Sequence, residues 1–124
     1  MKIIGLSGKI KSGKTTVAEY LTKDKDVAGL IFGFSCGIKE LVCDYFKTGY
    51  FPCDLDQQYI KDSPHRGGKK YRQILQEVGR KMREIWPDIW IANWQEAAEC
   101  MYEDRNIIVP DVRFPNEVKA IQDL

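Results

Sequence analysis

The amino-acid sequence predicts an α/β protein with a mostly parallel sheet. Short apolar runs that are typical of buried strands occur at residues 2–6, 30–34 and 106–110, and segments of helical periodicity separate them. Strands that alternate with helices in this way pair in parallel through right-handed crossovers. A length of 124 residues is enough for one domain, residues 1–124, with a modest core.

The predicted helices connect or follow these strands. Apolar residues recur at helical spacing in residues 14–23, 38–47, 71–85, 87–102 and 116–124. We expect Pro87 in the first turn of its helix, where the missing N–H costs nothing. Asn116 is expected to be the N-cap of the last helix.

Residues 48–70 interrupt this alternation. The segment is polar, contains two prolines and three glycines, and ends in a basic cluster at residues 65–70. We expect a long mobile loop with at most one short helix. Because loops of this length are more often functional than decorative, we expect this one to border a site.

Charge and cysteine content exclude several classes of function. The 19 basic and 18 acidic residues nearly balance, so no overall field recruits a nucleic acid polymer or an anionic membrane. The four cysteines form no CxxC pair, and His65 is the single histidine, which predicts free thiols in a reducing compartment rather than a zinc site. No apolar run resembles a signal peptide or a membrane span, so a soluble cytoplasmic protein is expected.

A glycine-rich segment follows the first predicted strand. Residues 8–15 read GKIKSGKT and match G-x-x-x-x-G-K-[ST], the phosphate-binding loop, in its usual place between a strand and a helix. Glycines permit backbone angles that turn successive N–H groups inward, towards an anion at the helix N-terminus. An ordinary βα turn with chance glycines accounts poorly for the full pattern. The expected nucleotide-binding residues are Gly8, Lys11, Ser12, Gly13, Lys14, Thr15 and Thr16.

Such a loop binds ATP with Mg²⁺. Lys14 is expected to reach the β- and γ-phosphates, and the Thr15 hydroxyl is expected to bind Mg²⁺. Proteins of several classes share this loop, so the phosphoryl acceptor has to be inferred from other residues.

The stretch VPDVRFPNE supplies candidates for that role. Asp111 follows a buried strand, so its carboxylate lies at the C-terminal edge of the sheet, where parallel sheets bind ligands. Arg113 lies two residues on, and Glu117 lies in the first turn of the closing helix. Asp111 alone could be a turn or cap residue, but the three together indicate a site that includes an Mg²⁺ ligand at Asp111.

The sequence resembles the bacteriophage-type deoxynucleoside monophosphate kinases of the P-loop class. The resemblance rests on LSGKIKSGKTT, FSCGIKE, YRQILQEVG followed by PDIWI, and VPDVRFPNE. It implies a three-layer P-loop NTPase fold and ATP-dependent phosphoryl transfer to a (deoxy)nucleoside monophosphate, a small-molecule substrate, which gives the diphosphate. The loop at residues 48–70 would then lie on the acceptor side.

The resemblance also implies roles for single residues. Lys14, Asp111 and Arg113 would be catalytic. Lys39 and Arg72 would bind the acceptor phosphate, Trp90 would flank the base, and Asp111, Arg113 and Glu117 would line the acceptor site. From the residues alone, Lys39 could instead be a solvated helix residue, Arg72 a surface ion-pair partner and Trp90 a core aromatic.

Two features depart from the family pattern. Arg80 and Lys81 follow Gly79, where the family has a threonine and an acidic residue, so the roles of Arg80 and Arg83 stay open. Family members also have further strands, so the fold is expected to be truncated after the third core strand. The strand at residues 2–6 would then be an open edge, which predicts a fragment of a longer protein or association with a second copy.

Two other functions remain open at this stage. One is an ATP-binding protein without transferase activity, and the other is a P-loop kinase of another small phosphorylated metabolite. If the protein is a kinase, Asp111 is expected to bind a Mg²⁺-bound water or a sugar hydroxyl rather than to accept a proton.

Overall fold

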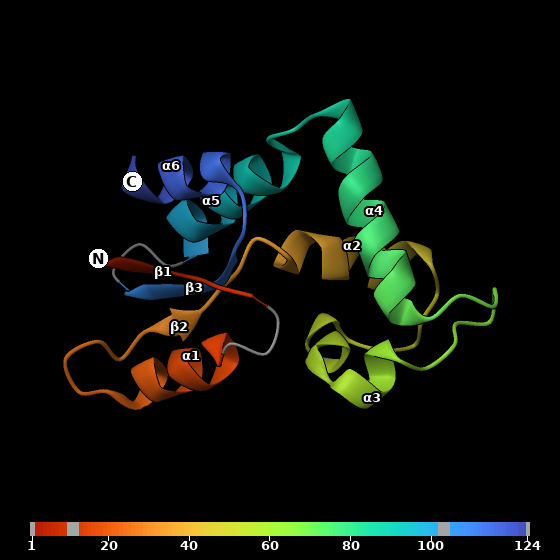
Figure 1. The fold of residues 1–124 in the computed structure, drawn as a ribbon, viewed down its shortest axis with the longest axis horizontal. Coiled ribbons are helices and arrows are strands. Elements are labelled where there is room, and N and C mark those ends of the chain that lie inside the picture. Colours follow the sequence, from red (N-terminus) through yellow and green to blue (C-terminus); the bar gives the residue numbers. More distant parts are fainter. Residues whose placement is uncertain (1, 10–12, 102–104, 124) are drawn as a thin grey trace. The chain divides into compact units, whose positions relative to one another are not determined.

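The computed structural model describes residues 2–9, 13–101 and 105–123. The chain, expected to form one domain, divides into two compact units. We name them the sheet unit, which comprises Met1–Phe34 and Ile91–Leu124, and the helical unit, Ser35–Trp90. Figure 1 traces the elements of each unit along the chain.

The sheet unit contains a three-stranded parallel sheet in the order β1-β3-β2. Its strands are β1 (Ile3–Ser7), β2 (Leu30–Ile31) and β3 (Ile107–Val112). The predicted α/β class with a parallel sheet is therefore confirmed. Within the described strands β1 pairs with β3 alone and lies at an edge, as expected, while association with a second copy through that edge stays a prediction.

The second strand is shorter than the predicted range of 30–34. The N–H of Phe32 still donates to the carbonyl of Ile108 at 2.9 Å, but the N–H of Phe34 donates to the side chain of Asp111 instead of to a strand carbonyl. A side chain on the neighbouring strand therefore ends the ladder.

The sheet unit also contains α1 (Lys14–Lys23) and α6 (Pro115–Gln122), which contact the strands, and all but the first two residues of α5 (Ile89–Met101). The bounds of α1 are those predicted from periodicity. The expectation for Pro87 is wrong, because the N–H of Ile89 donates to the carbonyl of Trp86 at 3.1 Å and closes a turn around Pro87 before the helix begins.

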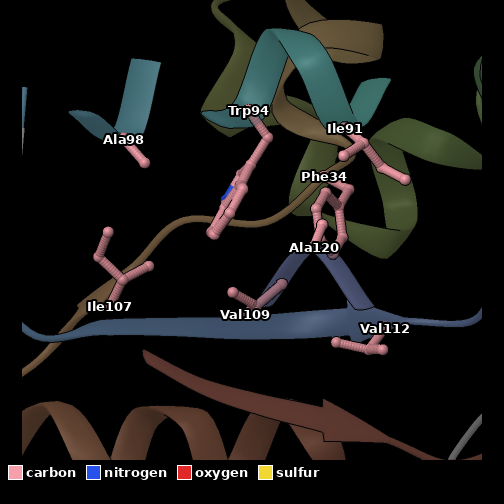
Figure 2. Packing of buried hydrophobic residues seen from close by; sticks show 8 residues of the cluster. All are labelled: Phe34, Ile91, Trp94, Ala98, Ile107, Val109, Val112 and Ala120. Atoms are coloured by element: carbon pink, nitrogen blue, oxygen red, sulfur yellow. The ribbon is translucent and has the colours of Figure 1, made fainter. Parts of the chain in front are cut away.

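The core of the sheet unit gathers around Trp94 (Figure 2). Trp94 is 1% exposed, its indole N–H donates to the carbonyl of Phe32 at 2.8 Å, and its ring contacts those of Phe32 and Phe34. The buried members of this cluster are Phe34, Ile91, Trp94, Ala98, Ile107, Val109, Val112 and Ala120. Apolar residues of β3 thus form the floor of the core, which accounts for the strength of the strand signal in the sequence.

The helical unit is built from α2 (Cys36–Tyr45), the 3₁₀ helix η1 (Pro52–Asp56), α3 (Gln58–Lys61) and α4 (Tyr71–Ile85). The last matches its predicted range, and α2 begins two residues before the predicted start. The expectation of at most one short helix in residues 48–70 is wrong, because Leu55 and Ile60 are buried and anchor two helical segments there. Mobility of this segment stays a prediction.

Two further observations concern the whole described chain. None of the four cysteines, all of which lie within the described residues, forms a disulfide, in agreement with the prediction of thiols, and burial raises the pKa of the Cys43 thiol. Among the residues that the structure describes, no helix combines the length and apolar character that a bilayer span requires.

Candidate functional site

The glycine-rich loop leads from β1 into α1. Gly13, the residue before the helix, has φ of 89°, a left-handed conformation that glycine adopts at little cost. The Lys14 ammonium donates to the carbonyl of Gly8 at 2.7 Å, so the lysine side chain folds back to the start of the loop. The predicted nucleotide-binding residues Lys11 and Ser12 lie outside the described residues.

The start of α1 is suited to an anion. Among the described residues no side-chain hydrogen bond caps it, and no acidic residue lies in its first turn. Thr15 and Thr16 are exposed there, and Lys14 adds a positive charge. The helix dipole and the uncapped N–H groups favour negative charge at this position.

The register of the sheet places Arg113 beside this loop. Ser7 of β1 is the partner of Val112 of β3, and the two strands are parallel. The residues that follow them, Gly8 and Arg113, therefore leave the same edge of the sheet next to each other. Arg113 is exposed, so its side chain is accessible to a ligand at this edge.

Asp111 is the penultimate residue of β3, and its carboxylate accepts a hydrogen bond from the backbone after β2. Its Oδ1 accepts the N–H of Phe34 at 3.0 Å. A Cβ atom added to Gly33 would lie 2.6 Å from the same oxygen, so only glycine allows the chain to pass so close to the carboxylate. Sequence reasoning missed this positioning role of Gly33, although a glycine inside the predicted strand at residues 30–34 was the available signal.

Substitution of Gly33 by alanine is expected to displace the Asp111 carboxylate and to lower the free energy of unfolding by about 1 to 3 kcal/mol, the usual cost of overpacking. Chemical denaturation measures the loss. In the double variant with Asp111→Ala the carboxylate is gone, so alanine at Gly33 should then add little to the loss. Fully additive losses would contradict the predicted clash.

Glu117 has a different environment from the one expected. It is 4% exposed, and its Oε1 accepts the N–H groups of Arg113 at 2.8 Å and Phe114 at 2.9 Å. Phe114 is the N-cap of α6 and Pro115 occupies the first helical position, so the expectation that Asn116 is the N-cap is wrong. The carboxylate of Glu117 stabilises the helix start, and its role in the acceptor site stays a prediction.

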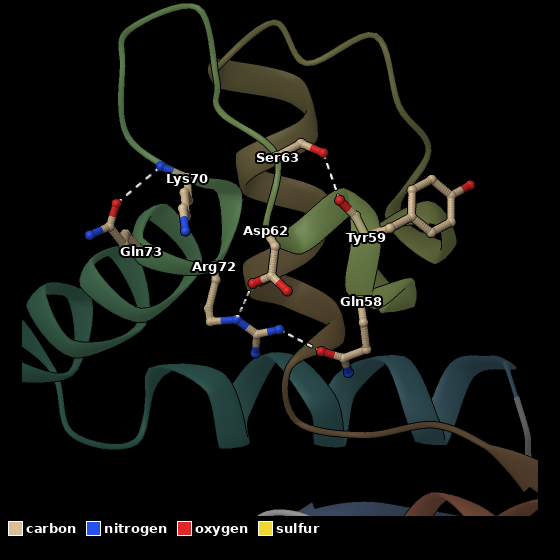
Figure 3. Close-up of polar contacts among 7 residues, drawn as sticks. All are labelled: Gln58, Tyr59, Asp62, Ser63, Lys70, Arg72 and Gln73. Carbon is tan, nitrogen blue, oxygen red and sulfur yellow. Dashed lines mark hydrogen bonds and ion pairs between the residues drawn. The ribbon is translucent and has the colours of Figure 1, made fainter.

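The predicted phosphate-binding cations of the acceptor site lie in the helical unit. Lys39 forms an ion pair with Asp56, and its side chain is 17% exposed. Figure 3 shows Arg72, whose Nε donates to Asp62 at 3.0 Å and whose Nη2 donates to Gln58. Both cations are therefore held by side chains of the 52–62 segment, and each has a structural partner in the absence of a ligand.

Trp90 belongs to the core of the helical unit. Its side chain is 5% exposed, and the indole N–H donates to the carbonyl of Gly79 at 3.2 Å. Gly79 also lies close to Ile38, because an added Cβ would be 3.1 Å from its Cδ1. This packing accounts for a glycine and a tryptophan at these positions, while a contact of Trp90 with a base stays a prediction.

The structure thus places the predicted residues in two groups. The loop residues Gly8, Gly13, Lys14, Thr15 and Thr16 share the sheet unit with Asp111, Arg113 and Glu117, and the register brings the loop and Arg113 to one sheet edge. Lys39, Arg72 and Trp90 belong to the helical unit. Arg80 and Arg83, whose roles the sequence leaves open, both lie on α4, and the Arg80 guanidinium is 4.0 Å from the Glu84 carboxylate.

By fold and site the protein is a parallel α/β protein with a glycine-rich loop between a strand and a helix at the carboxyl edge of its sheet. Comparison of the chain with protein-family models, with curated proteins and with solved structures finds no match. In the described part of the chain, no three histidine, cysteine, aspartate or glutamate side chains form a metal-binding group.

Proposed function

We propose that the protein is a nucleotide kinase with a P-loop NTPase fold, which transfers the γ-phosphoryl group of ATP to a (deoxy)nucleoside monophosphate. One observation carries the proposal. The Lys14 ammonium donates to the carbonyl of Gly8 at the N-terminus of α1, where the N-cap residue Gly13 offers no side-chain cap. A lysine beside the backbone N–H groups of a helix N-terminus that follows a glycine-rich loop is suited to bind the phosphates of a nucleotide.

The residues present fit a magnesium ion. Mg²⁺ prefers hard oxygen ligands, and it is usually held by one or two protein groups together with phosphates and waters. The Thr15 hydroxyl and the Asp111 carboxylate would supply such oxygens, so a cluster of three acidic ligands is not needed. When bound, the ion would neutralise charge on the phosphates of ATP.

The chemistry requires cations more than a base. The second pKa of a phosphate monoester is about 6, so the attacking oxygen is already largely anionic at neutral pH. What limits the reaction is repulsion between two polyanions and the in-line placement of one oxygen. Lys14 and Arg113 of the sheet unit would reduce that repulsion, and Asp111 would orient a hydroxyl or water.

Lys39 and Arg72 would bind the acceptor phosphate by exchanging partners. Each is paired with one carboxylate, from Asp56 and Asp62 respectively. A dianionic phosphate accepts charge-assisted hydrogen bonds from more than one donor, so it can replace such a carboxylate. The pairs would keep the side chains ordered until the acceptor arrives.

The test is an assay of ADP release with a panel of ribonucleoside and deoxyribonucleoside monophosphates. ADP that forms only when one of them is present supports the proposal. ATP binding without ADP release under any condition favours a binding protein instead. Release that requires a different phosphorylated metabolite, such as phosphomevalonate or dephospho-coenzyme A, favours the other kinase class.

Arg113→Ala is expected to raise the KM for the monophosphate by about 10-fold or more and to lower kcat, since a hydrogen bond to a charged group contributes about 1.5 to 3 kcal/mol. ATP affinity should stay nearly unchanged. Arg105→Ala removes the same charge at the opposite end of β3 and should have little effect on either constant. An equal loss of ATP affinity in Arg113→Ala would place Arg113 on the donor side.

A further inference from the structure

The helical unit contains a pocket that the proposed kinase chemistry does not use. Its volume is about 550 Å³, which is within the usual range for small-molecule sites. The helices α2 and α4 line it with apolar side chains, and these are Leu41, Phe46, Ile74, Val78 and Met82.

This pocket faces away from the cations of the predicted acceptor site. Leu41 lies two residues after Lys39 on α2, and Ile74 lies two residues after Arg72 on α4. Two positions along an α-helix are separated by about 200° of rotation, so each pair projects from nearly opposite faces of its helix. The pocket is therefore a separate site.

One wall of the pocket is a loop that is hydrogen-bonded to the residues at the end of α2. Residues 64–70, named the strap here, close through an antiparallel bridge between Pro64 and Lys70. The Nε2–H of His65 donates to the carbonyl of Phe46 at 2.6 Å, and its Nδ1 accepts the N–H of Gly67 at 3.1 Å. Arg66 donates to the carbonyl of Lys47 at 2.6 Å. These bonds attach the strap to the end of α2, where it forms one wall of the pocket.

The polar groups at the pocket leave one positive charge uncompensated. Lys69 of the strap bonds both carboxylate oxygens of Glu77, at 2.7 and 2.9 Å, and this hydrogen bond lowers the pKa of Glu77. The two charges therefore cancel. Lys81 also lines the pocket and is exposed; its charge acts on Glu77 as well, but within the described residues it forms no salt bridge, so the lining keeps a net positive charge.

We propose that this pocket binds a small amphipathic anion, with an aromatic or branched aliphatic body on the apolar floor and a carboxylate, sulfonate or phosphate group at Lys81. An apolar floor with a few fixed polar groups is the usual composition of a ligand site. The net positive charge of the lining favours a ligand with a negatively charged group. This function is independent of phosphoryl transfer.

Two dyes that differ in charge test the proposal. 8-Anilino-1-naphthalenesulfonate carries a sulfonate, whereas N-phenyl-1-naphthylamine has the same apolar body without charge. The wild-type protein should bind one molecule of either dye, and the sulfonate should bind about threefold more tightly, as expected for one exposed ion pair. Lys81→Gln should abolish that preference, while Lys23→Gln, at the end of α1, should preserve it.

The site of binding is read from methionine methyl groups. Met82 lines the pocket, and it is one of three methionines in the chain, so ¹³C-methyl labelling gives a simple spectrum in which Met82→Leu assigns the pocket signal. Saturable shifts of the Met82 methyl with both dyes, in the wild type and in Lys81→Gln, support the proposal and show that the pocket is intact. A Met82 signal that does not move, or a sulfonate preference that survives in Lys81→Gln, would overturn it.

Discussion

Replacement of Lys14 by alanine is expected to lower the rate of phosphoryl transfer about 100-fold or more, because a preorganised donor aimed at developing charge contributes about 3 kcal/mol. The stability of the fold should be nearly unchanged. The ammonium makes one hydrogen bond, to the carbonyl of Gly8, at an exposed position, so its loss removes little packing.

Steady-state ADP release and thermal unfolding are measured on the same preparations. Lys9→Ala serves as the control, since Lys9 carries the same charge in the same loop and is exposed. It should retain most of the activity. Near-normal turnover in Lys14→Ala would contradict the assignment of the phosphate loop, and equal losses in both variants would indicate a general effect of charge.

Glu117→Ala is expected to destabilise the protein by about 2 to 4 kcal/mol, because two N–H groups lose a charged acceptor and each unsatisfied group costs about 1 to 3 kcal/mol. Both N–H groups, of Arg113 and Phe114, are in partly buried positions at the start of α6. Glu117→Gln retains an oxygen acceptor of the same shape, so its loss should be much smaller.

Denaturant titration compares the two variants, and kinetics separates a structural from an acceptor role. A purely structural role predicts that Glu117→Gln retains both stability and the KM for the monophosphate. A raised KM in Glu117→Gln with unchanged stability would assign the side chain to the acceptor site. Equal stability of wild type and Glu117→Ala would contradict the capping role.

Elements with strong local signals could be predicted from the sequence. The helices Lys14–Lys23 and Tyr71–Ile85 have their predicted bounds. Apolar periodicity defines each helix, and the glycine-containing segment before it marks its start, so no distant contact is needed. The left-handed conformation of Gly13 was equally local, since it depends on the residue type at that position. The parallel pairing of the strands followed from their alternation with helices.

Hydrogen bonds between residues far apart in the sequence decided the features that could not be predicted. The second strand ends after Ile31 because Asp111, on another strand, takes the N–H of Phe34. Trp90 and Trp94 are equivalent in the apolar pattern, yet one bonds to the carbonyl of Gly79 and the other to that of Phe32. Periodicity identifies a buried face, but it does not say which group will satisfy a polar atom there.

The candidate site divides in the same way. The sequence by itself determined the glycine-rich segment between β1 and α1 and the position of Asp111 near the carboxyl end of β3, because both are features of contiguous residues. Only the tertiary structure showed that Glu117 is a buried cap and that Lys39 and Arg72 are paired with Asp56 and Asp62. An ion pair depends on where side chains of different elements meet, and no local rule of spacing encodes that distance.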